Sequence, residues 1–312
     1  MHRTLSQLLA ATLLAAATHT AAAPSPDAPQ AWSRLRFEGA GLAITARLDI
    51  TRDTLATADL PATDTALPGA LHPAGDAVGR LLVSSYFALP PLLHRRREAL
   101  LWFDPANYAA LLGTRETSGI DAGYRVSRYA AEGVQVANAS PANKTEKKSS
   151  PGTWTALTRS FVAYGPAVRA CTVISEPVAL LLLDPASLHE ASTGPGLCVV
   201  SKKRLHRVIF SAPVEATLEA HYNVHAADGS ATPTHKTRAQ RYSFRLRPAE
   251  GGGASAEQSE TFLGLSGDIQ IHVDHLTGTP LRLSGSAPLL GRVEFQLRDL
   301  WPAATPAGKQ PL

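Results

Sequence analysis

Residues 214–225 read VEATLEAHYNVH, and no other stretch of the chain indicates its backbone so clearly. Apolar side chains occupy every second position from Val214 to Val224, and the positions between them are polar. Successive side chains of a β-strand point to opposite faces of the sheet. A period of two therefore predicts an amphipathic strand with one dry face and one wet face.

The same alternation recurs along the chain, whereas long helical patterns are nearly absent. After the turn-forming sequence AADGSATPT, a second alternating run (Gln240–Arg247) is expected to complete a long hairpin. The other strand candidates are LAITARLDI, GRLLVSSYF, EALLWF, GYRVSRY, VQVANA, the run Ile269–Val273, PLRLSG and GRVEFQL. We therefore predict an all-β, mainly antiparallel fold, either an open or incomplete barrel or a strongly curved sheet, with one or two short helices.

The short helices are expected after Asp104 and Asp184. At each position an apolar run (ALLWF and ALLLL) meets Asp-Pro, where Asp can cap a helix and Pro suits its first turn. The two segments are either a remnant of duplication or, as we favour, two strand-to-helix junctions of the same chemistry.

The N-terminus predicts export. Arg3, an apolar run and the small residues Ala21–Ala23 have the pattern of a secretory signal peptide. We expect a signal peptide at 1–22, a flexible segment at 23–34, one β-rich domain at 35–303 with a mobile loop at 139–153, and a disordered tail at 304–312. No later apolar run approaches the roughly 20 residues of a membrane-spanning helix. The expected location is the periplasm of a Gram-negative bacterium, or otherwise the outside of the cell.

The overall charge is weakly positive. The formal net charge is +4, and charged residues make up 18% of the chain, so the excess is spread over a large surface. Nucleic acid is an unsuitable partner for an exported protein. An anionic lipid, glycan or envelope polymer fits better.

Cys171 and Cys198 are the two cysteines of the sequence. In an oxidising compartment an even pair most simply forms one disulfide, and the alternative is a pair of buried free thiols. No activating motif surrounds either residue, which argues against a catalytic thiol.

The sequence carries no catalytic signature. It lacks the Gly-x-Ser-x-Gly elbow, and His189-Glu190 is followed by Thr193 where the second histidine of a zinc helix would stand. We therefore predict no enzyme activity and no cofactor.

The histidines are the remaining candidates for metal chemistry. His221 and His225 lie four residues apart, roughly 13 Å along a strand, which is too far for one metal ion. Glu219, or a residue of a neighbouring strand, could join His221. A site built from His221, His272 and Asp274 requires a particular strand register. The alternative, which we favour, is a solvated strand face without a metal.

Two basic clusters, His94–Glu98 (HRRRE) and Lys202–Arg207 (KKRLHR), have two interpretations. They could bind acidic polymers or lipid headgroups, or they could be solvated ends of strands or loops. The arginine ladder Arg241, Arg245 and Arg247 has the same two interpretations.

The second half of the chain resembles a family of exported bacterial β-rich proteins of unknown function. The resemblance rests on LLLDPASL, RYSFRLRP and LTGTPLRLSGSAPLLGRVEFQLRDL, and covers roughly 154–301. It implies a highly curved antiparallel sheet of the general kind found in periplasmic lipoprotein carriers, and it brings no catalytic residues. The cysteine pair and Lys144–Lys148 depart from the family pattern.

These observations favour a non-catalytic envelope protein that binds a lipid or other hydrophobic ligand in the curved sheet. The ligand would contact the dry face, at Leu218, Tyr222, Val224, Tyr242, Phe244, Ile271 and Phe295; the alternative is that these residues form an ordinary core. A structural or assembly protein that binds an envelope partner or anionic polymer is the second candidate, and a metal-dependent hydrolase is the third.

Overall fold

The computed structural model describes residues 32–41, 44–61, 67–89, 93–119, 121–183, 196–201, 204–249, 262–287 and 291–303. These residues form one sheet of 16 strands and a few short 3-10 helices, which confirms the predicted all-β fold. The strands are β1 (Arg34–Gly41), β2 (Ile44–Ala56), β3 (Ala77–Leu89), β4 (Leu93–Phe103), β5 (Ala110–Gly119), β6 (Gly123–Tyr129), β7 (Gly133–Ser140), β8 (Ala156–Ala163), β9 (Cys171–Ser175), β10 (Gly196–Ser201), β11 (Arg204–Phe210), β12 (Val214–His225), β13 (Ala231–Pro248), β14 (Ser266–Val273), β15 (Pro280–Ala287) and β16 (Gly291–Trp301).

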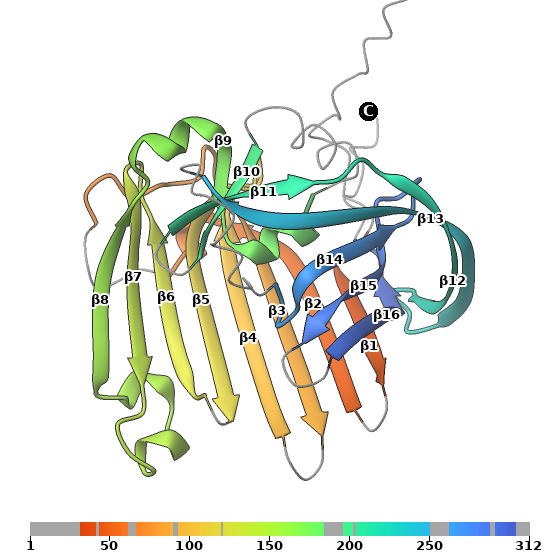
Figure 1. Ribbon diagram of the computed structural model, residues 1–312, viewed down its shortest axis with the longest axis horizontal. Helices are drawn as coiled ribbons and strands as arrows, with labels where there is room; N and C mark the ends of the chain where they lie inside the picture. The colour runs from red at the N-terminus through yellow and green to blue at the C-terminus, as the bar shows by residue number, and fades with distance from the viewer. Residues whose placement is uncertain are drawn as a thin grey trace, which may run out of the picture.

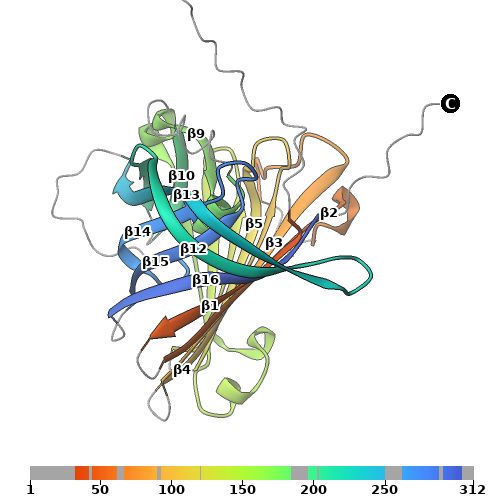
Figure 2. The same ribbon diagram turned by 90° about the vertical axis from the view of Figure 1, so that its right-hand side faces the viewer.

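Strands β12 to β16 close into a small barrel (Figure 2). Each consecutive pair is antiparallel, and a short parallel contact between β12 and β16 completes the ring at Asn223↔Asp299 and Val224↔Leu300. Two side chains of β12 bind Asp299 at this closure: the Asn223 amide lies 3.3 Å from its carboxylate and His225 Nε2 lies 2.8 Å from it. Closure removes the exposed strand edges that an open sheet would leave here.

Strand β16 also begins a second, open part of the sheet. It pairs with β1, and β1 to β8 follow in chain order as antiparallel neighbours that spread away from the barrel (Figure 1). Alternation within these strands buries one row of side chains, which includes Leu48, Val83 and Leu101, in the main hydrophobic core. The barrel interior and the inner face of the open sheet therefore share one continuous core.

A short segment covers the inner face of the open sheet, and we call residues 165–183 the cap. It contains the 3-10 helix η4 (Gly165–Ala170), β9 and the 3-10 helix η5 (Pro177–Leu181), which contacts β3 and β4. Cys171 and Cys198 form a disulfide that joins β9 to its parallel neighbour β10. The predicted pairing is confirmed, and it fits an oxidising, exported environment.

The helix predictions need correction. After Asp104 the chain makes a turn instead of a helix. The Asp104 carboxylate accepts hydrogen bonds from the Ala106 and Ala74 amides, and the backbone carbonyl of Asp104 accepts one from the Tyr108 amide. Asp184 lies outside the described residues. The apolar run before it, predicted as a strand, forms η5 instead, because Pro177 lacks an amide hydrogen for a sheet and is preorganised for a first helical turn.

The predicted hairpin is present but longer than expected. β13 begins at Ala231, so ATPT of the expected loop belongs to the strand, and Pro233 lies opposite Asn223. Alternation predicts Val214 on the dry face, but its side chain is exposed because the start of β12 extends beyond the core, whereas Leu218 and Ala220 are buried. Alternation alone does not show where along a strand the core ends.

Several predictions concern the ends and loops. The signal peptide at 1–22 and the tail at 304–312 lie outside the described residues, as does most of the 23–34 segment. The 139–153 loop begins inside β7 and contains two 3-10 turns, η2 (Glu146–Lys148) and η3 (Pro151–Thr153); its mobility stays a prediction. A further 3-10 turn, η1 (Thr57–Asp59), follows β2. Within the described ranges, no helix has the length and apolar character needed to cross a membrane.

Candidate functional site

The seven residues predicted to contact a hydrophobic ligand all belong to the core. Six of them are buried, and Val224 packs partly buried against the same cluster. The two phenylalanines of the set pack edge to face against other aromatic rings. The ring centroids of Phe244 and Phe262 are 5.2 Å apart, and those of Phe295 and Phe87 are 5.7 Å apart. This packing is what the alternative, an ordinary core, requires, and a ligand-contacting role for these residues stays a prediction.

The three metal candidates have different neighbours. His221 lies beside Glu219 and His235 on the β12–β13 hairpin. Asp274 forms an ion pair with Lys236, with 2.8 Å between Oδ2 and Nζ. His272 on β14 stands opposite Arg241 on β13 and Arg282 on β15. Within the described residues, His221, His272 and Asp274 do not form one cluster.

Burial gives His272 an unusual acid–base behaviour. The imidazole is largely removed from water and stands near Arg282 and Arg241, and these effects lower its pKa to about 4. The unfolded chain, with an ordinary histidine pKa near 6.5, binds a proton that the folded chain does not bind in this range. The contribution of neutral His272 to the stability of the folded chain is therefore fully present above about pH 6.5. It is lost as the pH falls toward 4.

We expect His272→Gln to reduce this acid sensitivity. The wild type should lose about 2–3 kcal/mol more unfolding free energy than the variant between about pH 7 and pH 4, measured by urea denaturation. His275→Gln, at an exposed position of the following turn, is the control and should behave like the wild type. Equal acid sensitivity in the wild type and His272→Gln would contradict the assignment.

The most distinctive polar surface lies on the inner face of the open sheet. Along β4 that face changes from apolar to basic: Phe103 and Leu101 are buried in the core, and Arg97 and Arg95 continue the same alternating row. Arg115 on β5 stands opposite Ala99 on β4. Arg125 on β6 stands opposite Arg115. We call Arg95, Arg97, Arg115 and Arg125 the arginine floor.

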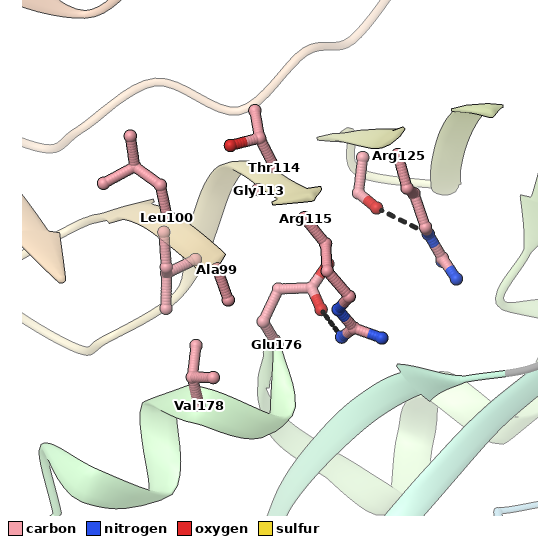
Figure 3. Close-up of a pocket in the computed structure, with 10 residues that line it drawn as sticks. Ala99, Leu100, Gly113, Thr114, Arg115, Arg125, Glu176 and Val178 are labelled. Atoms are coloured by element: carbon pink, nitrogen blue, oxygen red, sulfur yellow. Dashed lines mark hydrogen bonds and ion pairs between the residues drawn. The ribbon is translucent and has the colours of Figure 1, made fainter. Parts of the chain in front are cut away.

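The cap supplies one carboxylate to this floor (Figure 3). Glu176, just before η5, is buried. Its carboxylate accepts a hydrogen bond of 2.8 Å from the Tyr129 hydroxyl and forms an ion pair of 3.3 Å with Arg115. Gly113 makes this approach feasible, since a Cβ there would lie 3.0 Å from Glu176 Oε1. Burial and the neighbouring Glu176 carboxylate raise the pKa of Tyr129 well above its usual value, so this hydroxyl remains a donor.

Arg97 differs from Arg95 and Arg115 in lacking an acidic partner among the described residues, and Arg125 donates to the Ser127 hydroxyl instead of a carboxylate. Arg95 pairs with Asp121 at 3.2 Å and Arg115 pairs with Glu176, whereas Arg97 has no ion pair among the described residues and its Nε has no hydrogen-bond partner there. Burial, together with the charges of Arg95 and Arg115, lowers the pKa of Arg97 to about 10. A guanidinium in this position is stabilised by any anion that reaches it.

A small hollow of about 40 Å³ gives access to Arg97. Arg97, Arg115 and Ser85 supply its polar side, and apolar residues supply the rest: Val83, Ala99, Pro177, Val178 and Leu263, with Gly264. Gly264 has φ +90°, and a Cβ there would lie 3.4 Å from Arg97 Nη1. The hollow therefore combines two guanidinium groups with an apolar wall, which suits a small acidic group attached to an apolar body.

The sequence indicated only part of this site. HRRRE has two interpretations from sequence, a binding cluster or a solvated strand end, and strand alternation in the structure divides its arginines between two faces. Arg95 and Arg97 face inward, whereas Arg96 is well exposed and pairs with Glu98. Arg115 lies in β5, and Arg125 shares β6 with Arg128; only the strand register brings Arg115 next to the row of Arg95 and Arg97, and Arg125 next to Arg115. Within KKRLHR, Lys202 and Lys203 lie outside the described residues and Arg204 begins β11.

Comparisons with known proteins give little further information. No protein family and no curated protein match the sequence. Among solved structures, the chain is similar to the beta-barrel-like protein of the domain of unknown function DUF1849 from Brucella abortus, with 6% identity, 88% of this chain and 99% of that chain aligned, and a TM-score of 0.43. The expected resemblance to a bacterial β-rich family thus holds only as a weak likeness in fold, which says nothing about function.

Proposed function

We propose that this chain is an exported, non-catalytic binding protein for an acidic amphiphile, a lipid-like molecule with a carboxylate or phosphate group. The acidic group would contact Arg97 and Arg115 in the hollow, and the apolar part would lie against the wall formed by Val178 and Leu263. The observation that supports this proposal most strongly is the partly buried Arg97 without an acidic partner among the described residues.

Electrostatics favours such a ligand over a neutral one. Like charges directly opposite each other on neighbouring strands are destabilising, and Arg115 and Arg125 occupy such a pair. A bound anion offsets this repulsion, and hydrogen bonds between a guanidinium and an acidic oxygen are stronger than those between neutral groups. The hollow has a volume of about 40 Å³, enough for the acidic group only, so the apolar part would lie outside it, next to Val178 and Leu263.

A second candidate is an anionic envelope polymer. The arginine floor spans three adjacent strands, and strands lie about 4.8 Å apart, so its basic surface extends further than one headgroup requires. A polymer would contact several arginines in succession without using the apolar wall. The two candidates therefore differ in whether binding depends on an apolar part of the ligand.

Calorimetric titration with four soluble probes separates these candidates. Dodecyl phosphate carries an acidic group and an alkyl chain, and inorganic phosphate carries the acidic group alone. Dodecyl maltoside carries the same alkyl chain with an uncharged headgroup, and polyphosphate is an anionic polymer without an alkyl chain. We expect dodecyl phosphate to bind with a markedly lower Kd than the other three probes. Polyphosphate that binds more tightly than dodecyl phosphate would support the second candidate against the first, and no measurable binding of either would contradict both.

A further inference from the structure

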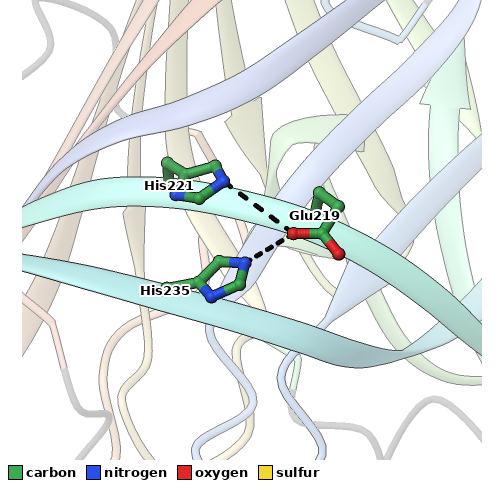
Figure 4. A group of neighbouring side chains, drawn as sticks. All are labelled: Glu219, His221 and His235. Atoms are coloured by element: carbon green, nitrogen blue, oxygen red, sulfur yellow. Dashed lines mark hydrogen bonds and ion pairs between the residues drawn. The ribbon is translucent and has the colours of Figure 1, made fainter.

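The β12–β13 hairpin brings three potential metal ligands together on a part of the fold separate from the arginine floor (Figure 1). His221 on β12 stands directly opposite His235 on β13. The register shifts by one residue between Thr217 and Ala220, and Glu219 lies in this bulge. Bulges redirect side chains, and here the Glu219 carboxylate points between the two imidazoles (Figure 4).

The ligand atoms are already close to one another. Glu219 Oε2 lies 2.5 Å from His235 Nε2 and 3.8 Å from His221 Nε2. The two imidazole rings stack with centroids 4.3 Å apart and planes 6° from parallel. One ligand atom from each of the three residues lies within 4.8 Å of the other two.

These separations are within reach of metal coordination. Nitrogen and oxygen ligands lie about 2.0–2.2 Å from Zn²⁺, and in a tetrahedral site they are therefore roughly 3.4 Å from one another. Imidazole binds a metal in the plane of its ring, so one of the two parallel rings has to turn out of the stack; all three side chains are exposed and free to make this rotation. The fixed part of the arrangement, the cross-strand pair and the bulge, belongs to the backbone.

We propose that Glu219, His221 and His235 form a surface site for one divalent transition-metal ion, Zn²⁺ in the first instance. Two imidazole nitrogens and one carboxylate are ligands that Zn²⁺, Cu²⁺ and Ni²⁺ bind well, whereas Ca²⁺ and Mg²⁺ require oxygen-rich sites. His221 and His235 border an open groove of about 450 Å³, from which water or a donor from another molecule can supply the fourth ligand.

The test is Zn²⁺ titration of the untagged, chelator-treated full chain, followed by calorimetry, with circular dichroism to verify the fold. We expect one equivalent to bind, and His221→Ala and His235→Ala each to weaken binding at least about 10-fold, since even the loss of a residue that only hydrogen-bonds to a metal ligand has an effect of this size. His275→Ala removes an exposed histidine outside the cluster and should leave the affinity unchanged.

Two results would overturn the proposal. One is the absence of stoichiometric Zn²⁺ binding to the wild type. The other is binding that persists unchanged in both His221→Ala and His235→Ala. Because these residues lie on an exposed hairpin face, their replacement should not unfold the protein, and a loss of affinity with an unchanged dichroism spectrum is attributable to the site. The result is also independent of the outcome for the arginine floor.

Discussion

Phe295→Ala is expected to lower the free energy of unfolding by about 3–5 kcal/mol. Phe295 is 1% exposed and lies on β16, the strand that belongs to both the barrel and the open sheet. It stands opposite Leu283 and Gly39 and packs edge to face against Phe87. Truncation would remove contacts on both sides of this junction and leave a cavity, which urea denaturation would detect as a lower midpoint.

This variant also separates the two interpretations of the dry-face residues. If they form an ordinary core, the full cost of a cavity is expected. If they surround an empty ligand chamber, Phe295→Ala should cost under about 1 kcal/mol, since little packing is lost. Phe161→Ala on β8 is the matched control; that ring is 52% exposed, and its removal should change stability by at most about 0.5 kcal/mol.

Removal of the disulfide should have the second-largest effect. The double variant Cys171→Ala, Cys198→Ala is expected to lose about 3.5 kcal/mol of unfolding free energy, because the bridge spans 27 residues and restricts the unfolded chain. The comparison is with the wild type in denaturation experiments without reductant. The wild type treated with reductant under denaturing conditions, and then refolded, should approach the stability of the variant.

The bridge also connects stability to the proposed site. It fixes β9 beside β10, and the chain continues from β9 directly into Glu176, Pro177 and Val178, which border the arginine floor. We therefore expect the double variant to bind dodecyl phosphate less tightly than the wild type under conditions where both remain folded. Unchanged stability in the double variant would show that the cap is held by its packing alone.

Alternation predicts β2 to β4, β6, β7 and β12 to β16, and it does not predict β1, β5 or β8 to β11. Alternation in β12 is regular because its outer face is exposed and its inner face packs in the barrel, whereas His272 on the outer face of β14 is buried. Strand β5 was missed, because polar residues occupy both faces of its second half. The apolar run in η5 was misassigned, since a helix buried on all sides has no periodicity that distinguishes it from a buried strand.

The candidate sites depended on information that alternation does not contain. Glu219 and His221 share a face by strand alternation, but their partner His235 becomes a neighbour only through the hairpin register and the bulge. The arginine floor likewise requires β4, β5 and β6 in one particular register. The charge imbalance at Arg97 depends further on where Asp121 and Glu176 lie, since these two acids pair with its neighbours.

The central claim is that Arg97 holds the acidic group of a ligand on the inner face of the sheet. Its most direct test compares the Kd of dodecyl phosphate for Arg97→Gln and Arg96→Gln, which differ by one position on β4 and by the face they occupy. Loss of a charge-assisted hydrogen bond costs about 1.5–3 kcal/mol, so Arg97→Gln should raise the Kd about 10- to 100-fold while Arg96→Gln leaves it within about 2-fold of the wild type. An equal Kd for the two variants, with both folded, would contradict the claim.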